Sequence, residues 1–195
     1  MELDIYDFDK TLLPFDSGGK FWSYCIRHYP WILSCAPYQF LGLILYCLGI
    51  YDLTKLKKPF FSFLTMIPKK KAAEKFWDKY DKYIYDWAKK ENRERYSVIV
   101  SASPDLIISE IAKRIEIDDY ICTIHDKNGA VIGKNCHDAE KVRRFREKYP
   151  DAEVINVYSD SIKNDKYIFS LAKHCFHVVK GKRIPFEFKN MYPEG

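Results

Sequence analysis

Three short polar stretches of this sequence combine residue types that suit phosphate chemistry. Asp7 and Asp9 follow an apolar run near the start of the chain and are followed by Thr11, in the pattern Asp-x-Asp-x-Thr. Ser101 follows the β-branched run "YSVIV", and Asp160 comes after "EVINVY" and one serine. Each stretch comes where a strand is expected to end. The carboxyl ends of parallel strands meet at one edge of a sheet, so we expect these residues to meet although about 150 positions separate Asp7 from Asp160.

The expected meeting of carboxylates predicts a magnesium ion. Up to four acids would gather there, namely Asp7, Asp9, Asp160 and Asp165. Two unit charges ~4 Å apart repel each other by roughly 4 kcal/mol at an effective dielectric constant near 20, against a typical domain stability of about 5–15 kcal/mol. A divalent cation would remove this repulsion. Hard oxygen ligands, with no His or Cys at ligand spacing, favour Mg²⁺ over zinc.

The same residues suit phosphoryl transfer. Asp7 can attack phosphorus and form an aspartyl-phosphate. Asp9 lies two residues later on extended backbone and therefore shares a face with Asp7, so it can protonate the leaving oxygen and then activate water. Ser101 opens the loop before a predicted helix, whose N-terminus receives anions. A lysine near the phosphate would offset the negative charge during transfer.

The elements that must position these residues form an α/β pattern. From Tyr96 onward strands alternate with helices, which predicts a doubly wound parallel sheet with helices on both faces. The opening strand, residues 3–6, is expected to join it. The other expected elements are a strand over 96–100, a helix from Ser103 as N-cap to about 115, a hairpin at Asn128-Gly129, a helix over 138–149, a strand over 153–158, a helix over 165–174 and a last strand over 175–179.

Residues 14–95 differ from the rest of the chain. They are rich in Trp, Tyr, Phe and Leu, helical in character, and contain no run that indicates strand, helix and strand. We interpret them as a helical cap domain inserted into a core domain of residues 1–13 and 96–195. An insertion at this point would lie over the carboxyl ends of the strands, where doubly wound folds bind ligands.

Four stretches resemble, in order, the four motifs of the haloacid dehalogenase superfamily of phosphohydrolases. They are "YDFDKTLL", "VIVSASPD", a lysine in "CHDAEKVRRF", and "VYSDSIKND". With a helical insertion after the first motif, the chain resembles the phosphoserine-phosphatase-like branch, and the layout matches from Leu3 to about Val179. The first motif is quite specific, whereas the second and third are weak when taken alone.

The resemblance implies a role for each matching position. Asp7 would be the nucleophile and a metal ligand. Asp9 would be the general acid and base, and would also bind the metal through its backbone carbonyl. Thr11 would support the loop, Ser101 would hold phosphate, and Asp160 would bind Mg²⁺.

Two positions stay open within the resemblance. Lys141 would neutralise charge, with Lys134 as its competitor; Lys141 is favoured because it opens a predicted helix beside the sheet edge. The family's last motif spaces its acids four residues apart, which here gives Asn164. We favour the next residue, Asp165, as the acid and metal ligand, with Asn164 as the alternative.

Residues 29–51 carry no formal charge and are long enough to span a bilayer, which takes about 20 apolar residues. A single span would place Asp7 and Asp160 on opposite sides of the membrane, and Pro30 and Pro37 divide the stretch. The favoured interpretation is a cap whose apolar helices pack on each other. Contact with an anionic membrane surface, or use of a lipid phosphate, is the less favoured alternative suggested by the lysines of "KLKK" and "PKKK" nearby.

Composition bounds the function. The chain has 195 residues, of which 47% are hydrophobic, and a net charge of +5, which suits an anionic ligand; no nucleic-acid partner is expected. Six cysteines without a C-x-x-C pair, and acids at positions 2 and 4 where a secretory signal would be basic and then apolar, favour a cytoplasmic protein with reduced thiols.

The predicted function is a Mg²⁺-dependent phosphomonoesterase that acts on a small phosphorylated metabolite through an aspartyl-phosphate. The alternatives are a phosphatase of a lipid phosphate at a membrane surface, a phosphotransferase or mutase, and a non-enzyme, either receiver-like or a membrane-docked binding module. The sequence leaves the physiological substrate and the oligomeric state open.

Overall fold

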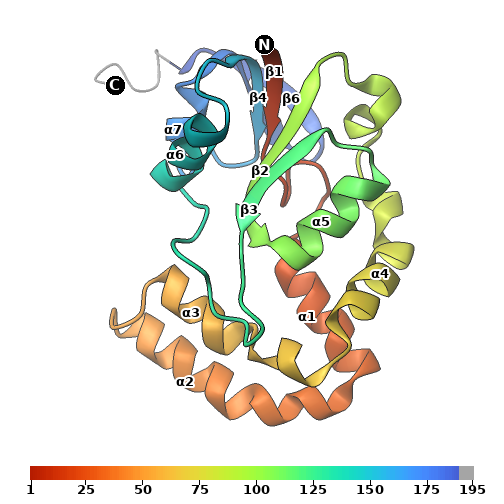
Figure 1. Ribbon diagram of the computed structural model, residues 1–195, viewed down its shortest axis with the longest axis vertical. Helices are drawn as coiled ribbons and strands as arrows, with labels where there is room; N and C mark the ends of the chain where they lie inside the picture. The colour runs from red at the N-terminus through yellow and green to blue at the C-terminus, as the bar shows by residue number, and fades with distance from the viewer. Residues whose placement is uncertain (189–195) are drawn as a thin grey trace.

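The computed structural model describes residues 1–188, which contain a six-stranded sheet in the order β3-β2-β1-β4-β5-β6 (Figure 1). The first five strands are parallel, and β6 pairs with β5 in the antiparallel direction. The strands are β1 (Glu2–Tyr6), β2 (Tyr96–Pro104), β3 (Asp119–Thr123), β4 (Glu153–Ser159), β5 (Ala172–Val179) and β6 (Lys182–Phe186). The predicted α/β fold with a doubly wound sheet is confirmed.

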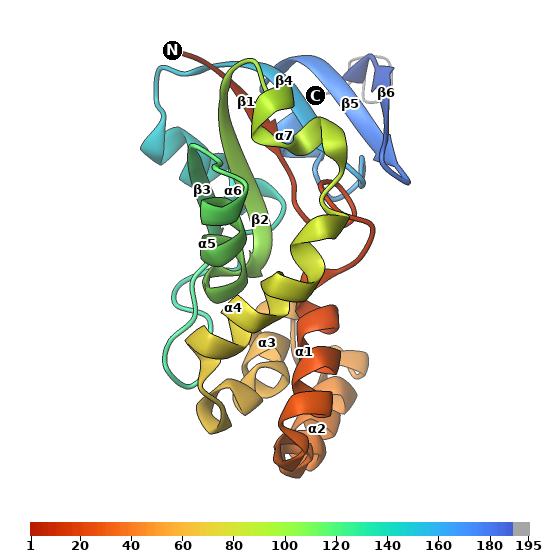
Figure 2. The ribbon, with the colours of Figure 1, turned by 90° about the vertical axis from the view of Figure 1, so that its right-hand side faces the viewer.

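Helices cover both faces of the sheet. On one side lies α5 (Asp105–Arg114), with α4 (Lys69–Tyr80) packed against it; α6 (Ala139–Lys148) and α7 (Lys166–Phe169) lie on the other (Figures 1 and 2). The five parallel strands run away from the end of the molecule that carries the N-terminus and point their carboxyl ends toward α1 (Figure 1).

The alternation of side chains along β1 divides the core into two layers. Leu3 and Ile5 are fully buried in a cluster with Phe145 of α6 and Phe169 of α7. Tyr6 belongs to the cluster on the opposite face. Neighbouring residues of a strand point to opposite faces, so one short strand anchors both layers.

After β2 the structure differs from two sequence-based predictions, the Ser103 helix cap and the hairpin at Asn128-Gly129. β2 continues to Pro104 and α5 begins at Asp105, so Ser103 does not cap this helix; its hydroxyl is used at the carboxylate site described below. The hairpin at Asn128-Gly129 is reduced to an isolated bridge between His125 and Val131. Gly129 has φ +81°, and a Cβ there would lie 2.6 Å from the Phe61 carbonyl oxygen, so this turn is packed against the helical segment.

After β4 the structure differs from the sequence-based prediction in two further places, the helix over 165–174 and the strand β6. The expected helix over 165–174 is only α7, which ends at Phe169, because β5 starts at Ala172 and pairs with β4 from Val154 onward. The sequence also gave no sign of β6. This strand contains Pro185 and is largely exposed, as suits an edge strand, and so it lacks the apolar run that marks the inner strands.

Between residues 14 and 95 the structure contains helices and 3₁₀ turns and no strand. We call this segment the helical insertion. Its elements are α1 (Ser17–His28), η1 (Pro30–Cys35), α2 (Ala36–Cys47), α3 (Leu53–Phe60), η2 (Ser62–Met66), α4, η3 (Asp81–Tyr83), η4 (Asp86–Ala88) and η5 (Lys90–Asn92). The first three helices lie at the end of the molecule opposite the N-terminus, and α4 leads back to the sheet (Figure 1). There the Trp77 indole donates a hydrogen bond to the Ile107 carbonyl, 2.9 Å.

The expectation that the apolar helices would bury one another is wrong for most of α2. α2 does pack against α3 at Gly42, where an added Cβ would lie 2.3 Å from Cγ of Pro59. Over Pro30–Cys47, however, only 11% of the residues are buried, and this segment is long and apolar enough to cross a membrane by length and composition. One neighbouring helix covers one side of α2 and leaves its other sides exposed.

Lys57 ties the helical insertion to the core. Its Nζ donates hydrogen bonds to Oδ1 of Asn135, 2.6 Å, to the Ala102 carbonyl, and to Oγ1 of Thr123, 3.4 Å. Burial lowers the pKa of Lys57 to about 8. All its nearest partners are neutral oxygens, so the amine loses its hydration without gaining an adjacent counter-ion.

Lys57 therefore predicts a dependence of stability on pH. Between pH 8 and the ordinary lysine pKa of 10.5 the unfolded chain binds more protons than the folded chain at this position. The free energy of unfolding should rise with pH in that window, by up to ~1 kcal/mol per pH unit from this group. Urea unfolding near pH 7.5 and pH 9.5 measures it, with Lys57→Met lacking the increment and exposed Lys58→Met retaining it. Equal pH dependence in wild type and Lys57→Met would contradict the assignment.

Candidate active site

The carboxyl ends of β1 and β4 bring the first and last motifs together. The Asp7 backbone N–H donates to the Tyr158 carbonyl, 2.9 Å, which continues the pairing of the two strands. The Thr11 hydroxyl donates to Oδ2 of Asp7, 3.1 Å, and its oxygen accepts the backbone N–H of Asp160, 2.9 Å. The single hydroxyl of Thr11 thus joins Asp7 to the loop of Asp160, as expected if the two acids serve one site.

A tight turn holds Thr11 in this position. The N–H groups of Thr11 and Leu12 both donate to the Phe8 carbonyl, at 3.2 and 2.9 Å. Lys10 has φ +58°, a left-handed conformation that non-glycine residues adopt at a cost. The fixed turn places a buried hydroxyl beneath the Asp7 carboxylate.

Lys141 lies between two carboxylates at the centre of the site. Its Nζ is 2.7 Å from Oδ1 of Asp7 and 2.7 Å from Oδ1 of Asp165. Oδ2 of Asp165 accepts the Ser159 hydroxyl at 2.5 Å. Lys134 is exposed, and so is Asn164. The structure therefore places Lys141 and Asp165 at the site, and their two competitors outside it.

The pKa values of Asp7 and Lys141 are both raised, but for different reasons. Burial raises the pKa of Asp7 to about 7; the Lys141 ammonium opposes the rise and the Asp165 carboxylate adds to it. Burial alone would lower the pKa of Lys141, but Asp7 and Asp165 outweigh it and hold that pKa above its usual value. Because Lys141 shares its one positive charge between Asp7 and Asp165, it offsets the effect of burial on Asp7 only in part, and the pKa of Asp7 stays raised.

Asp9 turns its side chain away from Lys141. Oδ1 accepts the backbone N–H of Ser17, 2.7 Å, at the first residue of α1, and Oδ2 accepts the Ser103 hydroxyl. A helix N-terminus stabilises a nearby carboxylate. Burial raises the pKa of Asp9 to about 6, with a further rise from the charge of Asp16, while the hydrogen bonds from Ser103 and Ser17 lower it. Asp9 is thus placed to exchange a proton near neutral pH.

Ser101 lies beside this group at the end of β2. It is buried, and its Oγ accepts the backbone N–H of Ser103, 3.1 Å. The bond uses the oxygen as an acceptor, so the hydroxyl hydrogen can be donated to an anion. Hydrogen bonds and ion pairs thus link Asp7 with Thr11, Lys141, Asp160 and Asp165, and Ser103 links Asp9 with Ser101.

The donors at this edge suit a hard cation. Asp7, Asp9, Asp160 and Asp165 bring four carboxylates, and Lys141 is the buried ammonium among them. Burial also raises the pKa of Asp160, and Asp165 adds to that rise. Within residues 1–188 no group of three or more His, Cys, Asp or Glu side chains is arranged to hold a metal. A cation here would therefore need backbone oxygen or water as well as carboxylates.

Asp165 is bonded to two neighbouring side chains and is more buried than Asp7: its side chain is 5% exposed, against 13% for Asp7. Both of its oxygens are engaged, one by Lys141 and the other by Ser159. Its position indicates that it orients Lys141.

A cavity opens beside Asp9, between the core and the helical insertion. Its core side includes Ser103 and His137, and its insertion side includes Leu53, Leu56 and Phe60 of α3. Lys57 also lines it. The wall that α3 contributes to this cavity is mostly apolar.

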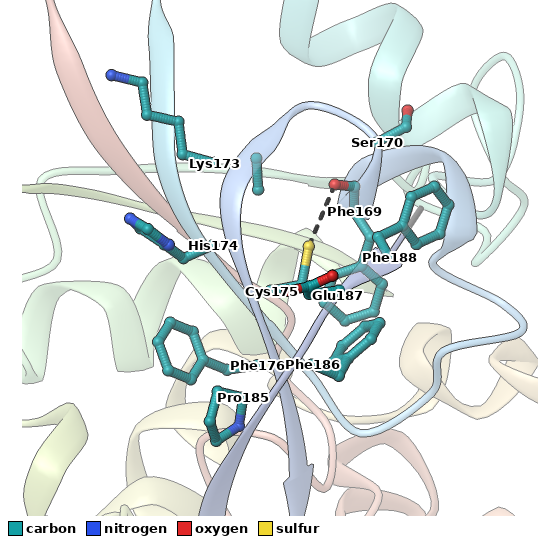
Figure 3. Close-up of a pocket in the computed structure, with 11 residues that line it drawn as sticks. Phe169, Ser170, Lys173, His174, Cys175, Phe176, Pro185, Phe186, Glu187 and Phe188 are labelled. Carbon is teal, nitrogen blue, oxygen red and sulfur yellow. Dashed lines mark hydrogen bonds between the residues drawn. The ribbon is translucent and has the colours of Figure 1, made fainter. Parts of the chain in front are cut away.

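A second cavity, lined by α7, β5 and β6, is not part of this site (Figure 3). Its wall contains Phe169, Phe176 and Phe186 around Cys175, and none of the predicted site residues. The Cys175 thiol donates a hydrogen bond to the Phe169 carbonyl, 3.5 Å, and burial raises the pKa of this thiol to about 11. The cysteine is therefore an unreactive thiol packed among aromatic rings.

Sequence reasoning missed Ser17, Ser103 and Ser159 as contacts of the site acids. The sequence does contain a signal for Ser103 and Ser159, namely their positions close to predicted site residues. Ser103 lies two residues after Ser101, and Ser159 directly before Asp160, each at the end of a predicted strand. Ser17 lies in the insertion and carried no local signal.

Comparison with known proteins agrees with this geometry. The family profile of haloacid dehalogenase-like hydrolases matches residues 5–167. Protein CicA of Caulobacter vibrioides (strain NA1000 / CB15N) is 33% identical over 92 residues, which are 44% of this chain and 41% of CicA. The matched segment therefore spans less than half of that curated relative.

Two solved structures share the fold. A protein of unknown function from Bordetella pertussis Tohama I superposes with a TM-score of 0.73 at 17% identity, covering 90% of this chain and 89% of the other. A phosphoserine phosphohydrolase-like protein from Francisella tularensis subsp. tularensis SCHU S4 gives a TM-score of 0.56 at 18% identity, covering 91% and 87%.

The family profile covers most of the chain and includes all the residues of the site. The resemblance expected from the motifs is confirmed. The chain belongs to the family of haloacid dehalogenase-like hydrolases.

Proposed function

We propose that this hydrolase is a Mg²⁺-dependent phosphomonoesterase that works through an aspartyl-phosphate on Asp7. The observation that carries the proposal is the pair of differently held acids at the end of β1. Asp7 is bound to a buried ammonium, whereas Asp9 is held by neutral donors at the N-terminus of α1. Two carboxylates in environments this different suit two roles, nucleophile and proton carrier.

In the first step an oxygen of Asp7 attacks phosphorus and the phosphorus–oxygen bond to the leaving group breaks. Asp9 gives its proton to the departing oxygen, so the product leaves as a neutral alcohol. Lys141 and the hydroxyl of Ser101 would balance the charge on the phosphoryl oxygens. Thr11 keeps Asp7 in line through its 3.1 Å hydrogen bond.

In the second step water attacks the phosphorus of the aspartyl-phosphate. Asp9, now ionised, accepts a proton from this water, and the bond between phosphorus and the Asp7 oxygen breaks. Inorganic phosphate leaves and both acids return to their starting states. The hydrogen bonds from Ser17 and Ser103 would keep the Asp9 side chain in place through both proton transfers.

Mg²⁺ would be held by the carboxylates of Asp7 and Asp160 and the backbone carbonyl of Asp9. Bound there, it would offset the charge of the acids and the phosphate. Asp165 would act on Lys141 instead, because it lies 2.7 Å from the ammonium and its side chain is only 5% exposed, against 13% for Asp7.

A small phosphorylated metabolite is the first candidate substrate, and a lipid phosphate is the second. The second is favoured by one observation, the apolar wall that Leu53, Leu56 and Phe60 give to the cavity beside Asp9. A substrate whose leaving group ends in an alkyl chain would fill that wall, whereas a compact polar metabolite would leave it in contact with water.

The proposal predicts which change abolishes activity. A panel of phosphomonoesters, including small metabolites and lipid phosphates, should release inorganic phosphate only with added Mg²⁺. Asp7→Asn should lower kcat by roughly 10³-fold or more, because it removes the nucleophile and keeps the side-chain shape. Phosphate release is measured with and without a chelator, and circular dichroism checks folding. Undiminished turnover by Asp7→Asn would contradict the proposal, as would transfer of all the phosphoryl groups to an added alcohol.

A second prediction separates a positioning role of Asp165 from metal binding. Asp165→Asn should lower kcat by about 10- to 100-fold, equivalent to roughly 1.4–2.7 kcal/mol, because Lys141 loses one of its two ionic partners. The Mg²⁺ concentration for half-maximal activity should stay unchanged.

The matched control is Asn164→Ala, which alters the neighbouring exposed position and should leave kcat within about twofold. A large rise in the Mg²⁺ requirement of Asp165→Asn would restore Asp165 as a metal ligand. A loss of activity in Asn164→Ala would return the acidic-motif position to Asn164.

A further inference from the structure

The outer side of the helical insertion exposes a concentration of apolar side chains. Residues 1–188 include 20 large hydrophobic side chains that are exposed, and 11 of them lie between Trp31 and Leu53. We call these 11 the α2 surface: Trp31, Leu33, Tyr38, Phe40, Leu41, Leu43, Ile44, Tyr46, Leu48, Ile50 and Leu53. α2 forms the edge of the molecule farthest from the N-terminus in both views (Figures 1 and 2).

The α2 surface lacks the charges that a helix in water normally carries. Residues 29–51 include no Asp, Glu, Lys or Arg, in a chain that is 30% charged. Phe40 is 65% exposed and Leu48 is 67% exposed. An apolar patch of this extent marks a contact with another molecule or with lipid.

The charge of the flanking sequence indicates whether the α2 surface contacts lipid or another copy of the chain. From Arg27 to Lys71 the chain has seven Lys or Arg and one acid, Asp52, a net charge of +6. The remaining 25 basic and 26 acidic residues give −1, so this segment holds the whole positive excess of the chain. Lys57 is bonded to the core, and the other six basic residues precede or follow the apolar stretch along the chain. Basic segments on both sides of an apolar face complement an anionic bilayer. A second copy of the chain would instead bring two segments of +6 together.

The geometry favours a helix that lies on the bilayer rather than one that crosses it. The segment Pro30–Cys47 has the length of a membrane span, so the helix packed against it decides between the two arrangements. Gly42 of α2 packs against Pro59 of α3, a helix that also carries Lys55 and Lys58. Lysines on the adjoining helix would have to enter the hydrocarbon if α2 crossed the bilayer.

We propose that the helical insertion docks on an anionic lipid bilayer through the α2 surface. α2 lies in the plane of the interface, with its exposed apolar side chains among the acyl chains and the nearby lysines at the headgroups. Leu53 belongs both to this surface and to the wall of the cavity beside Asp9. The docked face therefore borders the mouth of the candidate active site.

Co-sedimentation of the full chain with vesicles tests the proposal. Vesicles of phosphatidylcholine with about 30% phosphatidylglycerol should retain the protein at about 50 mM salt, at least ~5-fold more than phosphatidylcholine alone. Raising the salt to about 500 mM should weaken retention severalfold. The double substitution Phe40→Glu with Leu48→Glu should lower retention by at least ~10-fold.

Three controls make each outcome decisive. Ile184→Glu replaces an apolar side chain of β6 that is 48% exposed and distant from α2 in the sequence; it should bind as wild type does. Asp7→Asn should also bind normally, since docking needs no turnover, so binding and catalysis fail or succeed separately. Circular dichroism and turnover of a soluble phosphomonoester should be unchanged in the double variant, whose residues do not line the cavity.

Failure of the wild-type chain to bind anionic vesicles at low salt would overturn the proposal, and so would undiminished binding by the folded double variant. Sedimentation equilibrium without lipid tests the alternative that a second copy of the chain binds the α2 surface. A wild-type dimer that the double substitution converts to monomers would assign the α2 surface to a second copy of the chain.

Discussion

One buried ammonium shared by two carboxylates organises the candidate active site. Lys141 reaches from the first turn of α6 to Asp7, after β1, and to Asp165, after β4, at 2.7 Å from each. Buried charges are tolerated only when they are paired, and removing one partner leaves the others unpaired in a medium that cannot solvate them. The strand order places β1 beside β4, so the sheet brings these residues together before any ligand binds. Asp9 and Asp160 lie outside this ionic group, which is why the site still has room for a cation.

The helical insertion completes the site from the other side. The backbone N–H of Ser17 holds Asp9, Lys57 bonds to oxygens of the core loops, and the apolar residues of α3 face the cavity between them. A single helical segment thus contacts Asp9 and forms one wall of the cavity beside it, while its outer face stays apolar and exposed. In the proposed function the sheet positions the acids, and the insertion forms the wall that a leaving group would meet.

The sequence predicts well what depends on local pattern. Strand ends carrying Asp7, Ser101 and Asp160 follow from apolar runs that stop at polar residues, and Lys141 follows from its place at the start of a helix. Ser103 was misassigned because a serine before Pro-Asp is also a normal helix start; only the approach of Asp9 from a distant strand gives it another role. The edge strand β6 and the early start of β5 depend on pairing with a neighbour, which local pattern does not reveal. The exposure of α2 likewise depends on how many helices pack against it, which the composition of the segment does not reveal.

The account depends on Asp7 as the residue that carries the phosphoryl group, and its most direct test is chemical trapping. The protein turning over a radiolabelled phosphomonoester with Mg²⁺ is quenched in acid, digested, and its peptides are mapped. The account predicts label on the peptide that contains Asp7, released by hydroxylamine as an acyl-phosphate is. Label on a different residue, or steady turnover with no label on Asp7, would contradict it.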